Sequence, residues 1–295
     1  MSDDIPPTRA GARKPEPGLH MIATPIGAAR DITLRALDIL ASADVLAAED
    51  TRTLRHLMEI HGIPVAGRVM IPYHDHNGDA ARPRILAALA EGKSVAYASE
   101  AGTPLVADPG MKLARAVMDA GHRVLAAPGP SAVLAALTVA GLPTDRFLFA
   151  GFPPTGAGAR RSWMAELSTI PATLVIYESP KRVSRTLGEL RNSLGTTREA
   201  ALCRELTKRF EEVTRGTLEE LAERFADQEL KGEIVLVIDR GVVATPSQDD
   251  VEQALRNALA LPGARVKDVA AEVALRFGLA RRDLYQMALK LAERE

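Results

Sequence analysis

Residues 93–109, K-S-V-A-Y-A-S-E-A-G-T-P-L-V-A-D-P, decide the class of fold that the chain adopts. Residues 94–98 are short, apolar and β-prone, which is typical of a buried strand in a parallel sheet. The residues that follow favour neither helix nor strand. Gly102 allows a positive φ, and Pro104 keeps Thr103 out of the helical region. A buried strand is therefore expected to end in a rigid polar loop.

A helix is expected after this loop, over residues 111–120. Asp108 offers an N-cap for this helix, and Pro109 offers a first-turn proline. Taken alone, the loop is equally consistent with a routine turn. Two further Gly- and Pro-rich loops follow apolar stretches, A-T-P-I-G at 23–27 and P-G-P-S-A at 128–132. Ligands of open α/β sheets bind at the carboxyl ends of the strands, so three such loops indicate the rim of a binding site.

Apolar strands alternate with helical patterns through the first half of the chain. The predicted strands lie at residues 19–24, 44–48, 68–71, 94–98 and 123–126. Asp31 is expected to cap the first helix. This alternation predicts an α/β fold with a mostly parallel sheet that helices cover on both faces. We therefore expect a disordered polar tail at residues 1–18, followed by an α/β domain at residues 19–141.

A second α/β domain is expected over residues 142–241, after a Gly- and Pro-rich hinge. Its predicted strands lie at residues 147–151, 172–177, 200–204, 210–214 and 234–238. These strands alternate less regularly with helices, which indicates a sheet of mixed strand direction. Residues 242–250 are predicted to form a linker, and residues 251–295 a module of three helices. The basic pair at 281–282 follows a tight turn, as in a helix-turn-helix, and the alternative is a solvated helical appendage.

The composition is that of an ordinary soluble globular protein, because 46% of the residues are hydrophobic and 25% are charged. A net charge of −1 excludes a broadly basic nucleic-acid binder, so any RNA affinity must come from a local basic surface. No apolar run is long enough to cross a bilayer. The single cysteine, Cys203, excludes an internal disulfide and a cysteine-based zinc cluster. We expect a cytoplasmic protein.

Charged side chains gather at the predicted strand ends, where each is equally consistent with a helix cap or a surface ion pair. The acidic ones are Glu49, Asp50, Glu100 and Glu178, and the basic ones are Arg52, Lys181 and Arg204. The cluster His74-Asp75-His76 lacks a third ligand, so we predict no metal site. The sequence contains no Walker, Gly-x-Gly-x-x-Gly or Gly-x-Ser-x-Gly motif. A cleft of backbone-rich loops instead suits a flat cofactor that carries an adenine.

A series of motifs, in order along residues 19–240, resembles the bacterial ribosomal RNA small subunit methyltransferase I family of the tetrapyrrole methylase superfamily. In the first half these motifs are I-A-T-P-I-G at 22–27, D-I-T-L-R-A-L at 31–37, A-A-E-D-T-R at 47–52, Y-H-D-H-N at 73–77, S-E-A-G-T-P at 99–104, D-P-G at 108–110 and P-G-P-S-A at 128–132. In the second half they are G-L-P-T-D-R-F at 141–147, Y-E-S-P at 177–180, R-E-L-T-K at 204–208 and K-G-E-I-V at 231–235. The C-terminal module fits the family more weakly.

The resemblance implies the tetrapyrrole-methylase fold, with two unlike α/β domains around a cofactor cleft and a small C-terminal helical module. It implies a homodimer that transfers a methyl group from S-adenosyl-L-methionine to the ribose 2′-oxygen of a decoding-centre cytidine in 16S rRNA of the small ribosomal subunit. The cofactor-binding residues would be Pro25, Ser99, Glu100, Ala101, Gly102, Thr103, Pro130, Ser131, Ala132, Tyr177 and Leu206. The candidates for assisting deprotonation of the hydroxyl are Glu49, Asp50 and Lys181. RNA contacts are expected from Arg52, Arg204, Lys208, Arg281 and Arg282.

Two positions depart from the family pattern. Glu100 stands where the family usually has aspartate, and Lys181 stands where it usually has histidine. The longer Glu100 side chain would reposition a cofactor contact, and Lys181 would strengthen a phosphate contact or serve no role. Two alternatives remain open. One is a methyltransferase of the same fold that acts on a tetrapyrrole or a diphthamide precursor, and the other is a non-catalytic ribosome- or RNA-binding protein.

Overall fold

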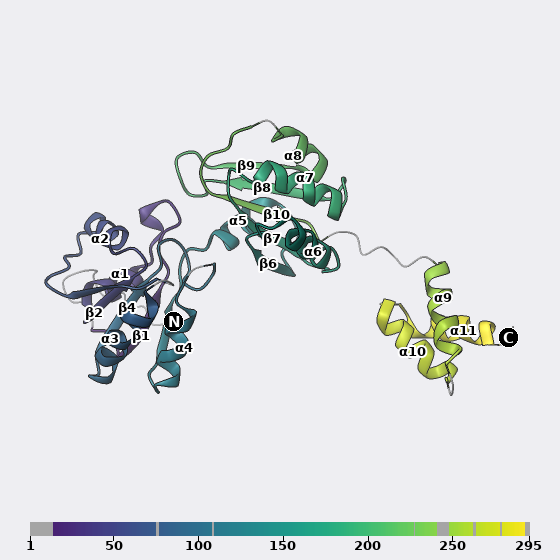
Figure 1. Cartoon of the computed structure of the whole chain (residues 1–295), viewed down its shortest axis with the longest axis horizontal. Helices are drawn as coiled ribbons and strands as arrows, with labels where there is room; N and C mark the ends of the chain where they lie inside the picture. The colour runs from purple at the N-terminus through teal and green to yellow at the C-terminus, as the bar shows by residue number, and fades with distance from the viewer. Residues whose placement is uncertain are drawn as a thin grey trace, which may run out of the picture. The chain divides into compact units, whose positions relative to one another are not determined.

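The computed structural model of the chain describes residues 14–74, 77–107, 109–226, 228–240, 248–261, 264–277 and 279–292. The chain divides after Gly241 into two compact units. The first unit contains two five-stranded sheets with their helices, and the second unit is helical (Figure 1). None of the described helices is long and apolar enough to cross a membrane.

The first sheet is entirely parallel and has the strand order β3-β2-β4-β1-β5. Its strands are β1 (Gly18–Ile22), β2 (Val45–Ala48), β3 (Val69–Pro72), β4 (Ser94–Ala98) and β5 (Val124–Ala127). Helices α1 (Leu34–Ser42) and α2 (Thr51–Ile60) pack on one face, and α3 (Gly78–Ala90) and α4 (Met111–Asp119) pack on the other. Strands β1, β2 and β4 are buried at every position, so their sequences are mostly apolar and do not alternate.

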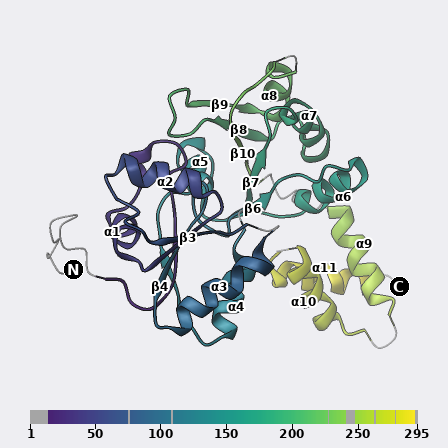
Figure 2. The same cartoon turned by 60° about the vertical axis from the view of Figure 1, so that its left-hand side comes forward.

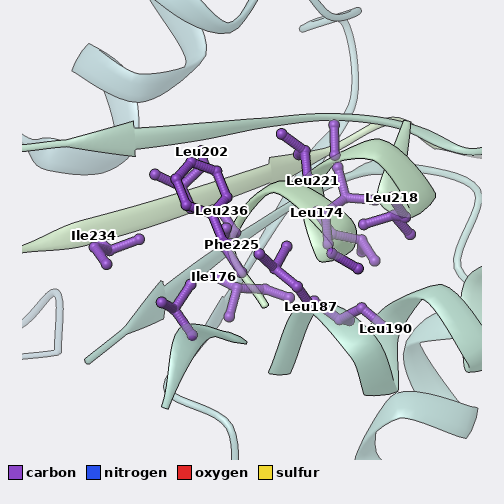
Figure 3. Close-up of a cluster of buried hydrophobic side chains, with 14 of the residues drawn as sticks. Leu174, Ile176, Leu187, Leu190, Leu202, Leu218, Leu221, Phe225, Ile234 and Leu236 are labelled. Carbon is purple, nitrogen blue, oxygen red and sulfur yellow. The ribbon is translucent and has the colours of Figure 1, made fainter. Parts of the chain in front are cut away.

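The second sheet is mixed and has the strand order β6-β7-β10-β8-β9. Its strands are β6 (Phe147–Gly151), β7 (Thr173–Glu178), β8 (Glu199–Arg204), β9 (Glu212–Thr217) and β10 (Ile234–Ile238). Only the β6–β7 pair is parallel among its described pairings. Helices α6 (Ala157–Ser168), α7 (Val183–Leu194) and α8 (Leu218–Arg224) cover one face. Figure 3 shows Leu187 of α7 and Phe225 near the end of α8 among strand side chains such as Leu236.

Helix α5 (Ala132–Ala140) joins the two halves of the first unit. It follows the first sheet in sequence but packs on β8, β9 and β10 of the second sheet, and it lies beside β8 and β10 in both overall views (Figures 1 and 2). Val133 and Leu137 of α5 are buried in one cluster with Val175 and Val237 of the second sheet. The loop between β5 and α5 is therefore held where the two halves meet.

The second unit consists of α9 (Gln248–Leu259), α10 (Val266–Phe277) and α11 (Arg281–Ala292). These are the three helices that the periodicity predicts. One side chain or more from each helix lies in a shared apolar core, for example Leu255, Ala270 and Leu284. Gly278, in the predicted tight turn, lies outside the described residues.

The predicted cap of α1 is wrong. Thr33 caps this helix, because its hydroxyl accepts a hydrogen bond from the Ala36 amide at 3.2 Å. Asp31 instead ends a short 3-10 turn, Ala29–Asp31. Asp108, the predicted cap of α4, lies outside the described residues, and Gly110 occupies the N-cap position with a φ of 121°.

Two predicted segment ends also differ from the structure. Gly18 belongs to β1 rather than to a tail, and Lys14 forms an ion pair with Asp44 at 2.9 Å. Residues 1–13 lie outside the described part of the chain. Helix α9 begins at Gln248, inside the predicted linker, since two acidic residues in its first turn favour a helix start.

Candidate functional site

Hydrogen bonds join the first two Gly- and Pro-rich loops. Thr24 and Gly102 exchange two backbone hydrogen bonds, of 2.9 and 3.0 Å. The Ser99 hydroxyl donates to the Gly102 carbonyl at 2.6 Å, and Ser99 is almost fully buried. These bonds fix the loop that follows β4 against the loop that follows β1. The loops at these two strand ends therefore contact each other directly.

The third loop is fastened to the second by one side chain. The Thr103 hydroxyl donates to the Pro130 carbonyl at 2.8 Å.

The loop after β4 has a strained backbone. Gly102 has a φ of 80°, and a Cβ atom at this position would lie 3.3 Å from Cγ2 of Ile26. Leu105 and Ala107 also have positive φ, of 73° and 60°, which is uncommon for residues with a side chain. Such backbone strain costs about 1–3 kcal/mol per residue and clusters at functional sites.

A pocket of about 370 Å³ lies between these loops and the second sheet. Its lining residues are Ile26, Ala101, Gly102, Thr103, Val106, Ala107, Ser131, Ala132, Phe152, Tyr177, Glu178, Ser179, Pro180, Gly232, Glu233, Ile234 and Val235. The lining is mostly apolar, with backbone groups from the loops and a few polar side chains. This combination is typical of a site for a small organic ligand.

Six of the predicted cofactor-binding residues line this pocket: Ala101, Gly102, Thr103, Ser131, Ala132 and Tyr177. Five others are outside its lining. Ser99 and Pro130 form hydrogen bonds within the rim, and Leu206 is buried in the same apolar cluster as Ile26. Glu100 is exposed, and Pro25 is half-buried. The sequence thus predicts one wall of the pocket together with residues that support it.

Most residues of the opposite wall are not among the predicted site residues. Phe152 lies at the end of β6 and remains 53% exposed, and its ring centroid is 5.5 Å from that of Tyr177, edge to face. Residues 232–235 contribute from the start of β10. Two features of the sequence mark these segments: an aromatic residue, Phe152, in a Pro-rich loop, and the motif K-G-E-I-V at 231–235. Neither feature indicates by itself that the two segments lie in one pocket.

The second wall includes a residue with a hydrogen-bonded carboxylate, Glu178. Glu178 is buried, and its carboxylate accepts hydrogen bonds from the Thr186 hydroxyl at 2.6 Å and from the Ser179 amide at 2.7 Å. Arg182 forms an ion pair with the same carboxylate at 2.7 Å. Arg182 also donates to the Pro153 carbonyl at 3.4 Å. The network therefore ties the end of β7 to the loop that carries Phe152.

The predicted catalytic carboxylates are at the end of β2 and outside the pocket lining. Asp50 is the N-cap of α2 and accepts hydrogen bonds from the Arg52 amide at 2.7 Å and from the Arg52 guanidinium at 2.7 and 3.1 Å. These hydrogen bonds lower the pKa of Asp50 to about 2. Hydrogen bonding to Asp50 raises the pKa of Arg52, and the charge of Glu100 adds to that effect. Glu49 directly precedes Asp50 and is half-buried.

The cations predicted to bind RNA are largely occupied by carboxylates. Arg204 donates to one oxygen of Glu212 at 2.9 and 3.1 Å. The Lys208 ammonium is 3.0 Å from Glu205 and 3.0 Å from Glu233. Arg281 and Arg282 are exposed in the first turn of α11, in the second unit. Lys181 is exposed and directly follows the pocket residue Pro180.

Lys208 also lies at a close contact between the two halves of the first unit. A Cβ atom on Gly27 would lie 2.5 Å from Cγ of Lys208 and 2.6 Å from Oγ1 of Thr207. The Ala28 amide donates to the Thr207 hydroxyl at 3.1 Å. The loop after β1 therefore contacts the loop after β8 as well as the loop after β4. In the His74-Asp75-His76 cluster, where no metal site is predicted, Asp75 and His76 lie outside the described residues.

Comparisons with known proteins agree with these observations. Residues 18–222 match the family model of Tetrapyrrole (Corrin/Porphyrin) Methylases, and residues 245–292 match the model of the RsmI C-terminal HTH domain. The ribosomal RNA small subunit methyltransferase I of Mesorhizobium japonicum is 45% identical over 97% of this chain and 96% of its own length. The chain belongs to the ribosomal RNA small subunit methyltransferase I family. It is a methyltransferase, and the resemblance found in its motifs is confirmed.

Further relatives and solved structures extend the comparison. The protein of the same name from Mycobacterium tuberculosis is 42% identical over 91% of this chain and 93% of its own length. A cobalt precorrin-4 methyltransferase has a TM-score of 0.57 at 18% identity, covering 74% of this chain and 93% of its own. A diphthine synthase has a TM-score of 0.55 at 15% identity, and the match covers 75% of this chain and 89% of the diphthine synthase. These structures confirm the predicted tetrapyrrole-methylase fold.

Proposed function

We propose that the chain methylates the ribose 2′-oxygen of a decoding-centre cytidine in 16S rRNA and that the pocket of about 370 Å³ holds its methyl donor. The chain is an S-adenosyl-L-methionine-dependent rRNA methyltransferase. The observation that carries the proposed site is a single pocket that combines the rigid loops of the first sheet with an apolar and aromatic wall from the second. The family of the chain supports the reaction and the substrate.

The pocket fits S-adenosyl-L-methionine in size and chemistry. Its volume lies in the range of about 300–1,000 Å³ that is usual for small-molecule sites. Backbone groups of residues 101–103 and 131–132 would bind the polar parts of the cofactor, and Gly102 allows close approach because it lacks a Cβ atom. Ile26, Val106 and Ile234 would contact its apolar surface.

The protein's part in the reaction is mainly alignment. S-adenosyl-L-methionine supplies a methyl group that is already activated on a sulfonium. The rim holds the reacting atoms in line, and the apolar lining excludes water. A ribose hydroxyl is a weak acid, so the remaining task is to favour loss of its proton.

We favour Lys181 among the three candidates for that task. It follows the pocket residues Ser179 and Pro180, whereas Asp50 is a helix cap whose pKa is about 2 and whose carboxylate is engaged by Arg52. A carboxylate with such a pKa accepts a proton poorly at neutral pH. The Lys181 cation would stabilise the negative charge that develops on the 2′-oxygen. Glu49 remains the second candidate.

The remaining proposals concern the assembly. We propose that the enzyme is a homodimer in the cytoplasm, where the small ribosomal subunit is its partner, and that Arg281 and Arg282 contact the RNA. The two arginines are exposed in the first turn of α11, in the module that matches the RsmI C-terminal HTH domain. Replacing both by alanine is expected to leave cofactor affinity unchanged and to weaken binding to 30S subunits most at low salt, because each contact to phosphate contributes most there. Sedimentation of the purified protein tests the dimer.

The test of the function is methyl transfer to matched acceptors. Purified 30S subunits, a free 16S oligonucleotide and a porphyrinoid would each be incubated with the enzyme and labelled cofactor, and the RNA products mapped by mass spectrometry. We expect 2′-O-methylcytidine in the 30S sample and little product from the other two. Transfer to the porphyrinoid, or to a base nitrogen in place of the ribose oxygen, would overturn the proposal. Cofactor binding without any transfer would favour the non-catalytic alternative.

A further inference from the structure

The cations around the pocket fall into two groups. Arg52, Arg204 and Lys208 each contact a carboxylate at 3.1 Å or less. Such cations attract RNA phosphates only weakly, because their charge is already compensated. A nearly neutral protein needs a local group of uncompensated cations to bind RNA.

Helices α6 and α7 provide such a group. Arg161 on α6, Lys181 in the turn before α7, and Arg185 on α7 are all exposed, and we call these three residues the α6–α7 patch. No described residue forms an ion pair within 4.0 Å of any of the three. Helices α6 and α7 lie side by side on the second sheet.

The nearby carboxylates are already occupied by two other arginines. Glu189 accepts from Arg160 at 2.5 and 2.8 Å, and Glu178 pairs with Arg182 at 2.7 Å. Hydrogen bonding to Arg160 lowers the pKa of Glu189, and the charges of Arg185 and Arg161 lower it further. Both patch arginines therefore lie near Glu189, but neither forms a direct ion pair with it. Arg160 and Arg182 thus occupy these two carboxylates, and the three patch cations are left without an ion pair among the described residues.

The patch continues directly into the pocket. Lys181 follows Pro180, which lines the pocket. Arg160 donates to the carbonyls of Pro154 at 3.1 Å and Thr155 at 2.9 Å, which fixes the loop that carries Phe152. Phe152 lines the pocket from this loop, and its ring is largely exposed. An exposed aromatic side chain beside free cations is typical of surfaces that bind single-stranded nucleic acid.

We infer that the acceptor RNA approaches the pocket across the α6–α7 patch, with flanking phosphates on Arg161 and Arg185, the reacting ribose beside Lys181, and a base stacked on Phe152. This inference rests on the proposed function and adds the path of the substrate to it. It replaces the expectation that Arg204 and Lys208 hold the phosphates. The contacts to phosphate set affinity and its dependence on salt, while stacking holds a nucleotide that is splayed from its neighbours.

The experiment compares the wild type with three double variants in binding to 30S subunits over a range of salt concentrations. In R161A/R185A the slope of log K against log salt should be less steep by about 1.4, since each lost contact to single-stranded phosphate removes about 0.7. Affinity at low salt should fall about tenfold. R161K/R185K should keep most of the affinity, because the charges remain. The matched control is R84A/K112A, which removes two exposed cations from α3 and α4.

Binding of S-adenosylhomocysteine, measured by calorimetry, should be the same in all four proteins. For Phe152, the variants F152L and F152A should raise KM for 30S subunits several-fold, with F152W close to the wild type, because stacking needs an aromatic ring. If the wild-type protein methylates 30S subunits but R161A/R185A keeps its salt slope, this inference fails and the proposed function stands. If the wild-type protein transfers no methyl group to 30S subunits, the proposed function itself fails.

Discussion

The two walls of the pocket are built by different means. The wall from the first sheet is mostly backbone, in three loops that are fastened to one another by hydrogen bonds of Thr24, Ser99 and Thr103. The wall from the second sheet presents side chains, with Phe152 edge to face against Tyr177 and the buried residue Glu178 beside them. The backbone wall suits an invariant cofactor, whereas the side-chain wall can be adapted to an acceptor. Variants on the backbone wall should therefore change cofactor affinity, and variants on the side-chain wall should change the binding of the acceptor.

The largest effect is expected from Glu178→Ala on the side-chain wall. It leaves Arg182 and the Thr186 hydroxyl without their buried partner, and breaking such a pair typically costs about 3 kcal/mol. Urea unfolding monitored by circular dichroism would measure the loss. Glu212→Ala is the control, because its pair with Arg204 is partly exposed and should cost about 1 kcal/mol or less. Equal losses in the two variants would contradict the supporting role of the Glu178 network.

The next largest effect is expected from Gly102→Val on the backbone wall. A side chain at a φ of 80° is strained, and its Cβ atom would approach Ile26. A strain of about 2 kcal/mol, if it displaces the loop, corresponds to about 30-fold weaker binding of S-adenosylhomocysteine in calorimetry. Gly188→Val is the control, since Gly188 has open space around it and no positive φ. Unchanged affinity in Gly102→Val would remove this loop from the cofactor site.

A smaller effect is expected from Thr103→Val, which removes only the hydrogen bond to the Pro130 carbonyl. The loss of one such bond is worth about 1 kcal/mol, so cofactor affinity should fall about fivefold. KM for 30S subunits should not change, because the acceptor is assigned to the other wall. Thr138→Val, on the exposed side of α5, controls for the loss of a hydroxyl. A fall in RNA affinity at constant cofactor affinity would reverse the assignment of the two walls.

The smallest effect is expected outside both walls, at Asp50. Its pKa is lowered from 3.8 to about 2, so its interactions stabilise the folded state fully above pH 3.8 and are lost as the pH falls toward 2. Arg52→Ala should move the pKa of Asp50 upward, as a carboxyl NMR titration would measure. The dependence of kcat on pH near neutrality should not change. A new ionisation in that profile would make Asp50 part of the catalytic machinery.

The sequence predicts the backbone wall better than the side-chain wall. Strand β4 has the predicted bounds because it is an apolar segment between polar residues, and helix α5 is the apolar segment that follows the loop at residues 128–132. The loops between them contact one another as parallel strand ends do in any open sheet. The position of the second wall depends on how α5 packs on the second sheet, and no local sequence pattern predicts that contact.

The ion pairs of the charged residues also depend on contacts between segments that no local sequence pattern predicts. Arg204 and Glu212 meet because β8 and β9 pair antiparallel in a particular register. Lys208 meets Glu233 across a loop and the start of β10. These partners are distant from the cations in sequence, so a basic residue at a strand end predicts a phosphate contact as readily as an internal ion pair. The exposed cations of α6 and α7 carried no motif and were missed.

The most direct test of the division of the pocket into two walls is a crystal structure of the protein with S-adenosylhomocysteine. We predict that the ligand lies in the pocket with its polar groups on the backbone of residues 101–103 and 131–132 and its thioether toward Phe152 and Ser179. The thioether sulfur would then face the side from which the RNA is proposed to approach. Ligand bound elsewhere, or bound with the thioether turned away from Phe152 and its polar groups on the second sheet, would contradict the division of the pocket into a cofactor wall and an acceptor wall.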